Sequence, residues 1–375
     1  MKILEIITDL GSGGAERFVV DLSNELANSN DVTLMTLLDD NVNPEHRNFN
    51  RYALDSNVAY YNLGLPNGLK MSSQLKVLKA IKAINPDIIH VHMACTLNHC
   101  ALAVICLAMK FKVYFTIHND IHNGYDKGLV KLLCNTYGHW GRFKSICLSE
   151  KNYNDFKSFY GKAPDVRCIV NGRAPMTPTD LYEEANSEMN GYRSSTDSKL
   201  LLHVARFNPI KNQNLLIDAF NQLIDEGYSI DLVIIGNGFE TDGGMLLQSK
   251  ANKRVHFIGT RKNVADYMLN ADIFCLSSDF EGMPITLLEA SLAGMPAVST
   301  PVCGAVDLIQ DGINGFLSRS HSLEDYKSAV IKAIENFDGI KANAMKMKDS
   351  SPYTIAECAK KYLDYFKETT NAIMC

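Results

Sequence analysis

Two glutamates separated by seven residues lie in a segment rich in glycine and proline. Glu281 follows an expected strand at 273–276, and Glu289 lies inside the helix that begins near Thr286. Carboxylates accept hydrogen bonds from hydroxyl groups, and a helix N-terminus binds phosphate. Glu289 stands in an apolar stretch, where a buried acid without a partner would cost several kcal/mol, so surface acids on a solvated helix explain it poorly. The pattern predicts a site for a phosphorylated sugar.

Two cations, Arg206 and Lys211, follow an expected strand at 200–204 and precede the helix that begins near Gln213. Fixed cations beside a helix N-terminus stabilise a diphosphate leaving group, on which negative charge grows as its bond breaks. An ordinary solvated charge pair would look the same in the sequence. On these residues alone both interpretations stay open.

A glycine-rich loop, residues 11–14, lies between an expected strand at 3–7 and a helix at 15–27. Small residues there, Gly13 and Gly14 among them, let backbone amides approach a phosphate. The loop lacks the G-x-G-x-x-G order because residue 16 is Glu, and no acid ends the second strand, so a dinucleotide cofactor is disfavoured. A tight structural turn is the alternative.

The sequence His90-Val91-His92 ends another expected strand, 88–91, and resembles a pair of metal ligands. Alternation along a strand places both histidines on one face by geometry alone. The sequence offers no nearby carboxylate or cysteine partner, so a metal site is disfavoured. We interpret His92 as a residue that lines a substrate site.

The elements that must position these residues form two α/β halves. A length of 375 residues favours two domains. A polar segment rich in proline and glycine, 173–198, indicates a boundary between them. Further short apolar runs indicate strands at 32–37, 113–117, 145–148 and 168–170 in the first half and at 231–235, 255–258 and 297–299 in the second. We predict two Rossmann-like domains that face each other across a cleft, followed by a last helix at 355–367 with one apolar face.

Composition excludes several classes of protein. Apolar residues at 46% and charged residues at 21% are typical of globular domains, and a net charge of −5 disfavours a general nucleic-acid binder. The ten cysteines stand singly, as expected of reduced core residues. The first strand does not resemble a signal peptide, and the longest apolar run is too short to span a membrane. We expect a cytoplasmic protein.

Taken together, these motifs resemble the retaining glycosyltransferases of family 4, which have the GT-B fold. The resemblance covers nearly the whole chain. It rests on the Gly-Gly-Ala-Glu loop, the cations Arg206 and Lys211, the turn at Gly236, the segment 257–259, and the two glutamates followed by Gly294-Met295-Pro296. It implies an acceptor-binding domain at 1–172, a donor-binding domain at 173–354, and a helix at 355–375 that returns to the first domain.

The resemblance also implies a role for individual residues. Glu281 would contact the donor sugar and Glu289 the ribose, while Arg206 and Lys211 would bind the diphosphate. The catalytic residues would be Glu281, His118, Arg206 and Lys211. Donor contacts would come from Gly13, Gly14, Arg206, Lys211, Gly236, Arg261, Glu281, Gly282, Met283, Pro284, Ile285, Thr286, Leu287 and Glu289, and the acceptor side would hold His92, Asn119 and Asn171.

The implied reaction moves a hexose or N-acetylhexosamine from a nucleotide sugar, a UDP-sugar by family frequency, to a saccharide or lipid-linked saccharide. Configuration would be retained and neither a metal nor another cofactor would be needed. Bacterial surface polysaccharide synthesis (capsule, O-antigen or exopolysaccharide) is the implied pathway. The alternatives are a nucleotide-sugar epimerase and a catalytically inactive GT-B partner subunit.

Charge is unevenly distributed along the chain. The first 170 residues carry 18 Lys and Arg against 16 Asp and Glu, and the remainder carry 19 against 26. Within the first part, four basic residues alternate with apolar ones: Lys127, Lys131, Arg142 and Lys144. This stretch fits either peripheral contact with the inner leaflet of a membrane or a core helix with a solvated face, and both interpretations stay open.

Overall fold

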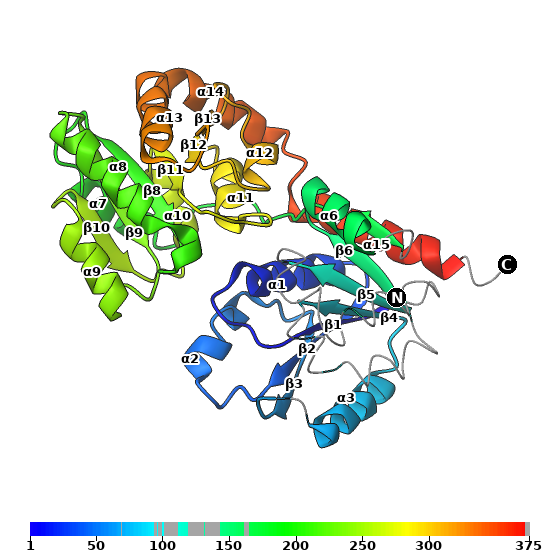
Figure 1. Cartoon of the computed structure of the whole chain (residues 1–375). Helices are drawn as coiled ribbons and strands as arrows, with labels where there is room; N and C mark the ends of the chain where they lie inside the picture. The colour runs from blue at the N-terminus through cyan, green and yellow to red at the C-terminus, as the bar shows by residue number, and fades with distance from the viewer. Residues whose placement is uncertain are drawn as a thin grey trace. The chain divides into compact units, whose positions relative to one another are not determined.

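The computed structural model divides the chain into two compact units, residues 1–174 with 353–375 and residues 175–352. It describes residues 1–68, 70–93, 96, 100, 112–118, 131, 143–160 and 165–371. Each unit has its own sheet (Figure 1). Each also has its own hydrophobic core. The α/β class predicted from the apolar pattern is confirmed in both.

The first unit is built on a parallel sheet that, among the described residues, has seven strands in the order β3-β2-β1-β4-β5-β6-β7. The strands are β1 (Lys2–Ile7), β2 (Asp31–Leu38), β3 (Ala59–Leu65), β4 (Ile88–His92), β5 (Lys112–Ile117), β6 (Phe143–Cys147) and β7 (Val166–Cys168). The order reverses between β1 and β4, and the crevice at such a reversal, outside the carboxyl ends of the strands, is where open α/β sheets bind ligands. The glycine loop after β1 and His92 at the end of β4 both lie at this point.

Helices cover both faces of this sheet. They are α1 (Gly14–Ala27), α2 (Pro44–Arg47), α3 (Met71–Ile84), α6 (Glu150–Tyr160) and α15 (Ile355–Asn371), with a 3-10 turn at Arg51–Ala53. One core cluster joins α3 and α6 to the sheet, and another joins α1 to α15 on the opposite face. The last helix therefore packs on the first unit, through Tyr362, Tyr365 and Phe366, which are fully buried.

The second unit repeats the plan with strands in the order β10-β9-β8-β11-β12-β13, all parallel. The strands are β8 (Lys199–Val204), β9 (Ile230–Ile235), β10 (Val255–Gly259), β11 (Ile273–Leu276), β12 (Ala297–Ser299) and β13 (Gly315–Leu317). The helices are α7 (Tyr182–Gly191), α8 (Gln213–Asp225), α9 (Asp242–Lys250), α10 (Val264–Asn270), α11 (Ile285–Leu292), α12 (Ala305–Leu308), α13 (Leu323–Glu335) and α14 (Phe337–Asp349), with a 3-10 turn at Pro209–Lys211. The strand order reverses between β8 and β11.

The structure differs from the sequence analysis in the expected boundary segment, 173–198. Residues 182–191 form α7, which packs on α10. The helix buries only Ala185 and Met189, so the apolar pattern there is too weak to predict it. The chain passes between the two units at 174–175 and again at 352–353. These two passages lie together, because Arg173 and Thr354 form an isolated β-bridge.

The basic stretch considered for membrane contact is described only in part. Lys127 and Arg142 lie outside the described residues, and Lys131 is exposed. Lys144 is buried, forms an ion pair with Asp165, and lies over the ring of Tyr365. It is a core-facing residue of β6, which corrects its interpretation as part of an interfacial surface.

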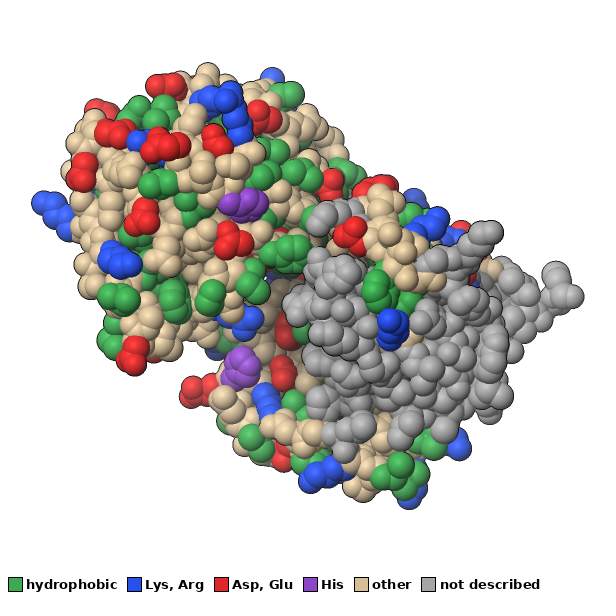
Figure 2. Space-filling model, viewed as in Figure 1, with side chains coloured by type: hydrophobic (Ala, Val, Ile, Leu, Met, Phe, Trp, Pro, Cys, Tyr) green, Lys and Arg blue, Asp and Glu red, His purple; other side chains and the backbone are tan. Residues whose placement is uncertain are grey.

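Surface charge and helix length also bear on whether the protein contacts or crosses a membrane. On the face of the second unit seen in Figure 2, acidic and basic side chains are interspersed, and neither gathers into a broad patch. Among the described residues, no helix has the length and apolarity that crossing a bilayer would require.

Candidate functional site

The loops after β8 and β11, two neighbouring strands, are tied together by hydrogen bonds. The Ser277 hydroxyl donates to the carbonyl of Lys211 at 2.8 Å, and the amide of Asp279 donates to the carbonyl of Ile210 at 2.8 Å. The side chain of Asn212 also donates to Asp279 at 2.7 Å and caps α8. These contacts hold the turn that carries Lys211 against the loop that carries Glu281.

Lys211 and Glu281 form an ion pair, with Nζ 2.6 Å from Oε1. The Ser278 hydroxyl donates to the same oxygen at 2.7 Å. The two side chains are 26% and 12% exposed, so the pair is open to water on one side. A cation and a carboxylate that the sequence assigned to different parts of one ligand are thus joined in the structure. An incoming anion would have to compete with Glu281 for Lys211.

Helix α11 has an open N-terminus and begins four residues after Glu281. It begins at Ile285 after Pro284, and no side chain caps it. The amides of Leu287 and Leu288 both donate to the carbonyl of Pro284 at 3.1 Å, which leaves the preceding amides, of Ile285 and Thr286, directed out of the helix end. Such an end attracts an anion. Glu289 lies one turn further and is 8% exposed, and helical side chains lean toward the N-terminus.

Gly304, in the loop after β12, sets the position of the glutamate loop, and the sequence analysis did not identify it. Its φ is +71°, which favours glycine. A Cβ there would lie 2.7 Å from Pro284 Cδ and 3.0 Å from the carbonyl oxygen of Gly282. The signal that could have found it is a glycine that follows a buried strand next to the site. Gly282, Met283 and Pro284 are all buried against this neighbour.

The remaining predicted donor residues of this unit lie on loops at the same edge of the sheet. Arg206 is exposed just after β8, and no described residue forms an ion pair with its side chain. The amide of Gly236 donates to the carbonyl of Gly259 at 3.0 Å, and a Cβ on Gly236 would overlap the carbonyl oxygen of Ala205. The loops after β8, β9 and β10 therefore run against one another.

Arg261 is engaged within the protein. Its guanidinium donates to Tyr267 Oη at 2.8 Å and to Glu188 Oε1 on α7 at 2.9 Å, and it also reaches the carbonyl of Ile258. The side chain thus fastens α7 to the sheet edge.

The glycine loop of the first unit joins β1 directly to α1. Gly13 is the extended N-cap of α1, and no side chain caps the helix. The loop is held from behind by a segment that the sequence analysis did not single out: the Asn50 side chain donates to the carbonyl of Gly11, and the amide of Leu10 donates to the carbonyl of Arg47. The Glu16 carboxylate lies beside Gly13, so a phosphate at this helix end would have to displace it.

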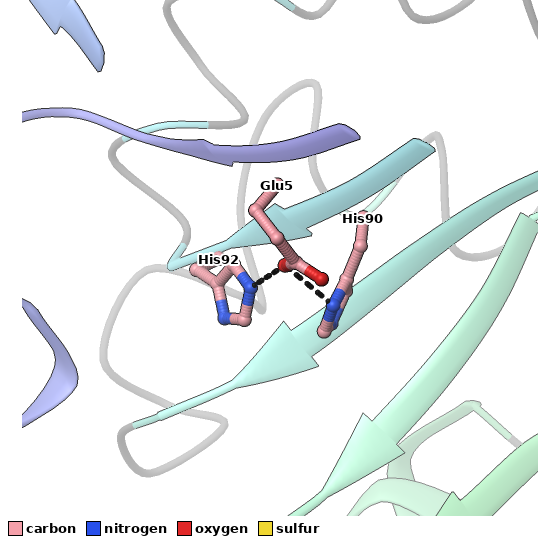
Figure 3. A group of neighbouring side chains, drawn as sticks. All are labelled: Glu5, His90 and His92. Atoms are coloured by element: carbon pink, nitrogen blue, oxygen red, sulfur yellow. Dashed lines mark hydrogen bonds and ion pairs between the residues drawn. The ribbon is translucent and has the colours of Figure 1, made fainter. Parts of the chain in front are cut away.

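A cluster of fully buried side chains joins β1 to β4 (Figure 3). Glu5 Oε2 lies 2.8 Å from His90 Nδ1 and 2.6 Å from His92 Nε2. Beyond it, His92 Nδ1 lies 3.1 Å from Nε2 of His118, which follows β5 and is partly exposed. His90 Nε2 lies 2.7 Å from the hydroxyl of Thr116. Both histidines of β4 point to one face, as strand alternation predicts.

Within the cluster, the Glu5 carboxylate is ionised. Burial alone would raise the pKa of Glu5, but its contacts with His90 and His92 outweigh burial and lower that pKa to about 2. Burial lowers the pKa of His92 to about 4 and holds the pKa of His118 well below its usual value. At neutral pH an ionised Glu5 therefore contacts a neutral His92, and His92 in turn contacts a neutral His118.

Glu5, His90 and His92 could together be metal ligands, because their ligand atoms lie within 4.8 Å of one another. The structure thus supplies the carboxylate that the sequence analysis did not find. Ligand atoms at 2.0–2.1 Å from a tetrahedral zinc stand about 3.3 Å apart. The contacts of 2.6 and 2.8 Å are shorter than that, and the 2.6 Å contact between His92 and Glu5 is a direct hydrogen bond.

Of the residues predicted on the acceptor side, the two that the structure describes are buried. His92 is fully buried behind His118, and Asn171 is 2% exposed. The next residue, Gly172, lies so close to Thr354 that a Cβ on it would overlap the carbonyl oxygen of Thr354. Asn119 lies outside the described residues.

Family models of glycosyltransferases match both units. The family described as glycosyltransferase family 4 matches residues 12–174, and that described as glycosyl transferases group 1 matches residues 185–348. Among solved structures, Anabaena HepE in complex with UDP and glucose aligns with a TM-score of 0.75 at 19% identity, covering 98% of this chain and 100% of the other. Sucrose-phosphate synthase from Thermosynechococcus elongatus aligns with a TM-score of 0.78 at 17% identity, covering 99% and 100%. At such identities the structures show the shared fold.

Curated relatives agree in class. N-acetyl-alpha-D-glucosaminyl L-malate synthase of Bacillus anthracis is 27% identical over 67% of this chain and 66% of its own length. A probable sucrose-phosphate synthase of Thermosipho melanesiensis is 29% identical over 60% and 52%. An Escherichia coli UDP-Gal:alpha-D-GlcNAc-diphosphoundecaprenol alpha-1,3-galactosyltransferase is 24% identical over 71% of each. The chain thus spans half to two thirds of the length of the first two relatives.

The two family matches together cover residues 12–174 and 185–348, and the chain aligns with a solved glycosyltransferase structure from Rickettsia africae with a TM-score of 0.79 at 17% identity, over 98% of each chain. The chain therefore belongs to the family 4 glycosyltransferases, which have the GT-B fold.

Proposed function

We propose that this chain transfers a hexose or N-acetylhexosamine from a UDP-sugar to a saccharide or a lipid-linked saccharide. One observation carries the proposal: Glu281, which pairs with Lys211, lies four residues before the open N-terminus of α11, at the carboxyl ends of β8 and β11. A cation, a helix end and carboxylates at one sheet edge match the charge of a sugar joined to a diphosphate.

Each group would bind one part of the donor. Lys211, Arg206 and the first amides of α11 would hold the diphosphate. Glu289, one turn further along the helix, would accept hydrogen bonds from the ribose hydroxyls. When the diphosphate binds Lys211, this lysine would leave Oε1 of Glu281. That oxygen could then accept hydrogen bonds from the sugar. Donor binding would therefore exchange one ion pair for another.

The transfer would retain the configuration of the sugar. The bond between the anomeric carbon and the diphosphate oxygen breaks, and the acceptor oxygen bonds to the same face of that carbon. The acceptor's proton passes to the leaving diphosphate oxygen. Lys211, Arg206 and the helix end would stabilise the negative charge that grows on the diphosphate, so the proposal needs no metal ion.

Relatives support the choice of donor and acceptor. Solved structures of HepE contain UDP and UDP-glucose, and the name of the E. coli relative specifies a UDP-Gal donor and a diphosphoundecaprenol-linked acceptor. A relative in Salmonella typhi is a Vi polysaccharide biosynthesis protein, 29% identical over 30% of this chain. These names favour a step in bacterial surface polysaccharide synthesis.

The test is a panel of UDP-, GDP- and ADP-sugars incubated with the full chain, followed by measurement of free nucleotide and of sugar products. We expect UDP release from one UDP-sugar, faster with a lipid-linked saccharide present, and NMR of the product should show the anomeric configuration of the donor. Interconversion of the nucleotide sugar without nucleotide release would indicate an epimerase. Donor binding without turnover would indicate an inactive partner subunit. Either outcome would overturn the proposal.

A further inference from the structure

A continuous line of contacts leads from a fully buried carboxylate to a partly exposed histidine. Glu5 Oε2 contacts His92 Nε2 at 2.6 Å, and His92 Nδ1 contacts His118 Nε2 at 3.1 Å. Glu5 and His92 have no exposed surface, whereas His118 follows the end of β5 and reaches the surface of its unit in part. Glu5 and His92 therefore cannot touch a ligand, but His118 can.

The order of donors and acceptors along this line can be deduced. An ionised carboxylate only accepts hydrogen bonds, so Nε2 of His92 carries a proton. A neutral His92 then has a lone pair on Nδ1, and the contact with His118 requires that Nε2 of His118 carry the proton and donate it. In neutral His118 the remaining ring nitrogen, Nδ1, is an acceptor.

Packing and electrostatics support this assignment. The ring of Phe18 on α1 lies edge to face against His118, with centroids 5.7 Å apart, which restricts rotation of the imidazole. The lowered pKa of Glu5 keeps it ionised, and the lowered pKa values of His92 and His118 keep both rings neutral near pH 7.

We propose that Glu5, acting through His92, is a positioning residue that holds His118 in the tautomer protonated on Nε2, so that Nδ1 faces the substrate as a hydrogen-bond acceptor. The partner this selects is a group that donates a hydrogen bond, such as a sugar hydroxyl. The assignment of the tautomer does not depend on the proposed function, whereas the identification of the partner as a donor sugar rests on it. His92 then acts from behind His118, in place of the direct role in acceptor binding that the sequence suggested.

A second branch of the same cluster provides a matched control. His90 leads through the hydroxyl of Thr116, at 2.7 Å, to Tyr362 Oη on α15, at 3.2 Å from that hydroxyl. Thr116→Val removes a buried polar group from the cluster but leaves the line from Glu5 to His118 complete. It therefore reports the cost of disturbing this core without changing the tautomer of His118.

The experiment is nitrogen NMR of the full chain labelled with ¹⁵N in its histidine rings, with the His118 signals assigned by their loss in His118→Gln. In the wild-type protein Nε2 of His118 should be protonated and Nδ1 should not. Glu5→Leu removes the acceptor, so His92 is expected to turn its proton to Nδ1 and donate to His118, which then carries its own proton on Nδ1. Glu5→Gln retains an acceptor oxygen and should keep the wild-type pattern, as should Thr116→Val.

A wild-type His118 protonated on Nδ1 would overturn the proposal even if Glu5→Leu failed to fold. So would an unchanged tautomer in a folded Glu5→Leu protein, or a changed one in Thr116→Val. With the donor identified, Glu5→Leu should raise the KM for the donor about tenfold, the value of one hydrogen bond, and Glu5→Gln should restore it. If no nucleotide sugar is used at all, the proposed function fails, while the NMR measurement still decides the tautomer.

Discussion

Replacing Lys211 with methionine should separate catalysis from stability in the second unit. Methionine keeps most of the aliphatic stem of lysine and removes only the ammonium group. In the structure this group contacts Glu281 at 2.6 Å, and the lysine side chain is 26% exposed. An ion pair that is open to water contributes up to about 1 kcal/mol to folding, and Glu281 keeps its hydrogen bond from Ser278. The fold should survive, since domains are stable by about 5–15 kcal/mol.

The effect on turnover should be much larger. If Lys211 stabilises the charge that grows on the leaving diphosphate, its loss should cost about 100-fold in kcat/KM, or about 2.7 kcal/mol of barrier. The assay is the rate of UDP release with the donor found in the panel, measured beside the thermal midpoint of each variant. The loss of rate should exceed what the change in stability explains.

Lys327→Met is the matched control, because it removes a lysine from an ion pair of similar length in the same unit. Lys327 lies 2.8 Å from Glu226, with side chains 13% and 46% exposed, and also contacts Gln222. Gln222 lies about 14 Å along α8 from Gln213, where the helix begins after Lys211, so this ion pair is well separated from Lys211. Lys327→Met should show a similar small change in stability and a normal rate. A wild-type rate for Lys211→Met, or equal losses in the two variants, would refute the assignment of Lys211 to the diphosphate.

Three further predictions concern the site loop, pH and metal ions. Gly304→Ala should weaken UDP binding measured by calorimetry, because its Cβ would lie 2.7 Å from Pro284 Cδ. The control is Gly312→Ala, where φ is +76° but the nearest neighbour is 3.9 Å away, so this change should lower stability alone. Equal UDP affinity in the two variants would argue against the loop contact. Burial lowers the pKa of His203 to about 4, so the stability it contributes is present above its unfolded pKa of about 6.5 and is lost as pH falls toward 4. Urea unfolding at pH 7 and pH 5 should show that this group lowers the free energy of unfolding by about 2 kcal/mol at the lower pH. His203→Asn should remove this difference, and an equal change in the free energy of unfolding between the two pH values in both proteins would contradict the assigned cause. Elemental analysis should find no stoichiometric metal at the Glu5 cluster, and EDTA should leave transfer unchanged; loss of activity that zinc restores would contradict the hydrogen-bonded interpretation.

Most of the central strands could be predicted from the sequence, because parallel strands covered on both faces read as continuous apolar runs. The expected strands at 273–276 and 297–299 match β11 and β12 residue for residue. The elements that were missed lie at the margins. Strand β3 is an edge strand whose residues are mostly partly exposed, and β13 has only three residues. Elements that bury little surface leave little apolar pattern to recognise.

The site was predictable in its parts but not in its contacts. The sequence placed Lys211 and Glu281 at the ends of two strands, yet 70 residues separate them, and only the pairing of β8 with β11 makes them neighbours. Likewise, Glu5 meets the histidines of β4 because β1 pairs with β4 in a register that sets Glu5 opposite His90. Strand order and register come from the whole sheet, so no local pattern contains them.

Glu5 and Glu281 both contact nitrogen groups, but they differ in a way that fits their proposed roles. Glu5 has no exposed surface and is held between two histidines, and removing a partner from a buried charge is costly. Its contacts are therefore permanent, as a residue that fixes a tautomer requires. Glu281 is partly exposed and pairs with a lysine that water can reach. A contact of that kind can be exchanged for a ligand at low cost, as a residue that must release Lys211 to a diphosphate requires.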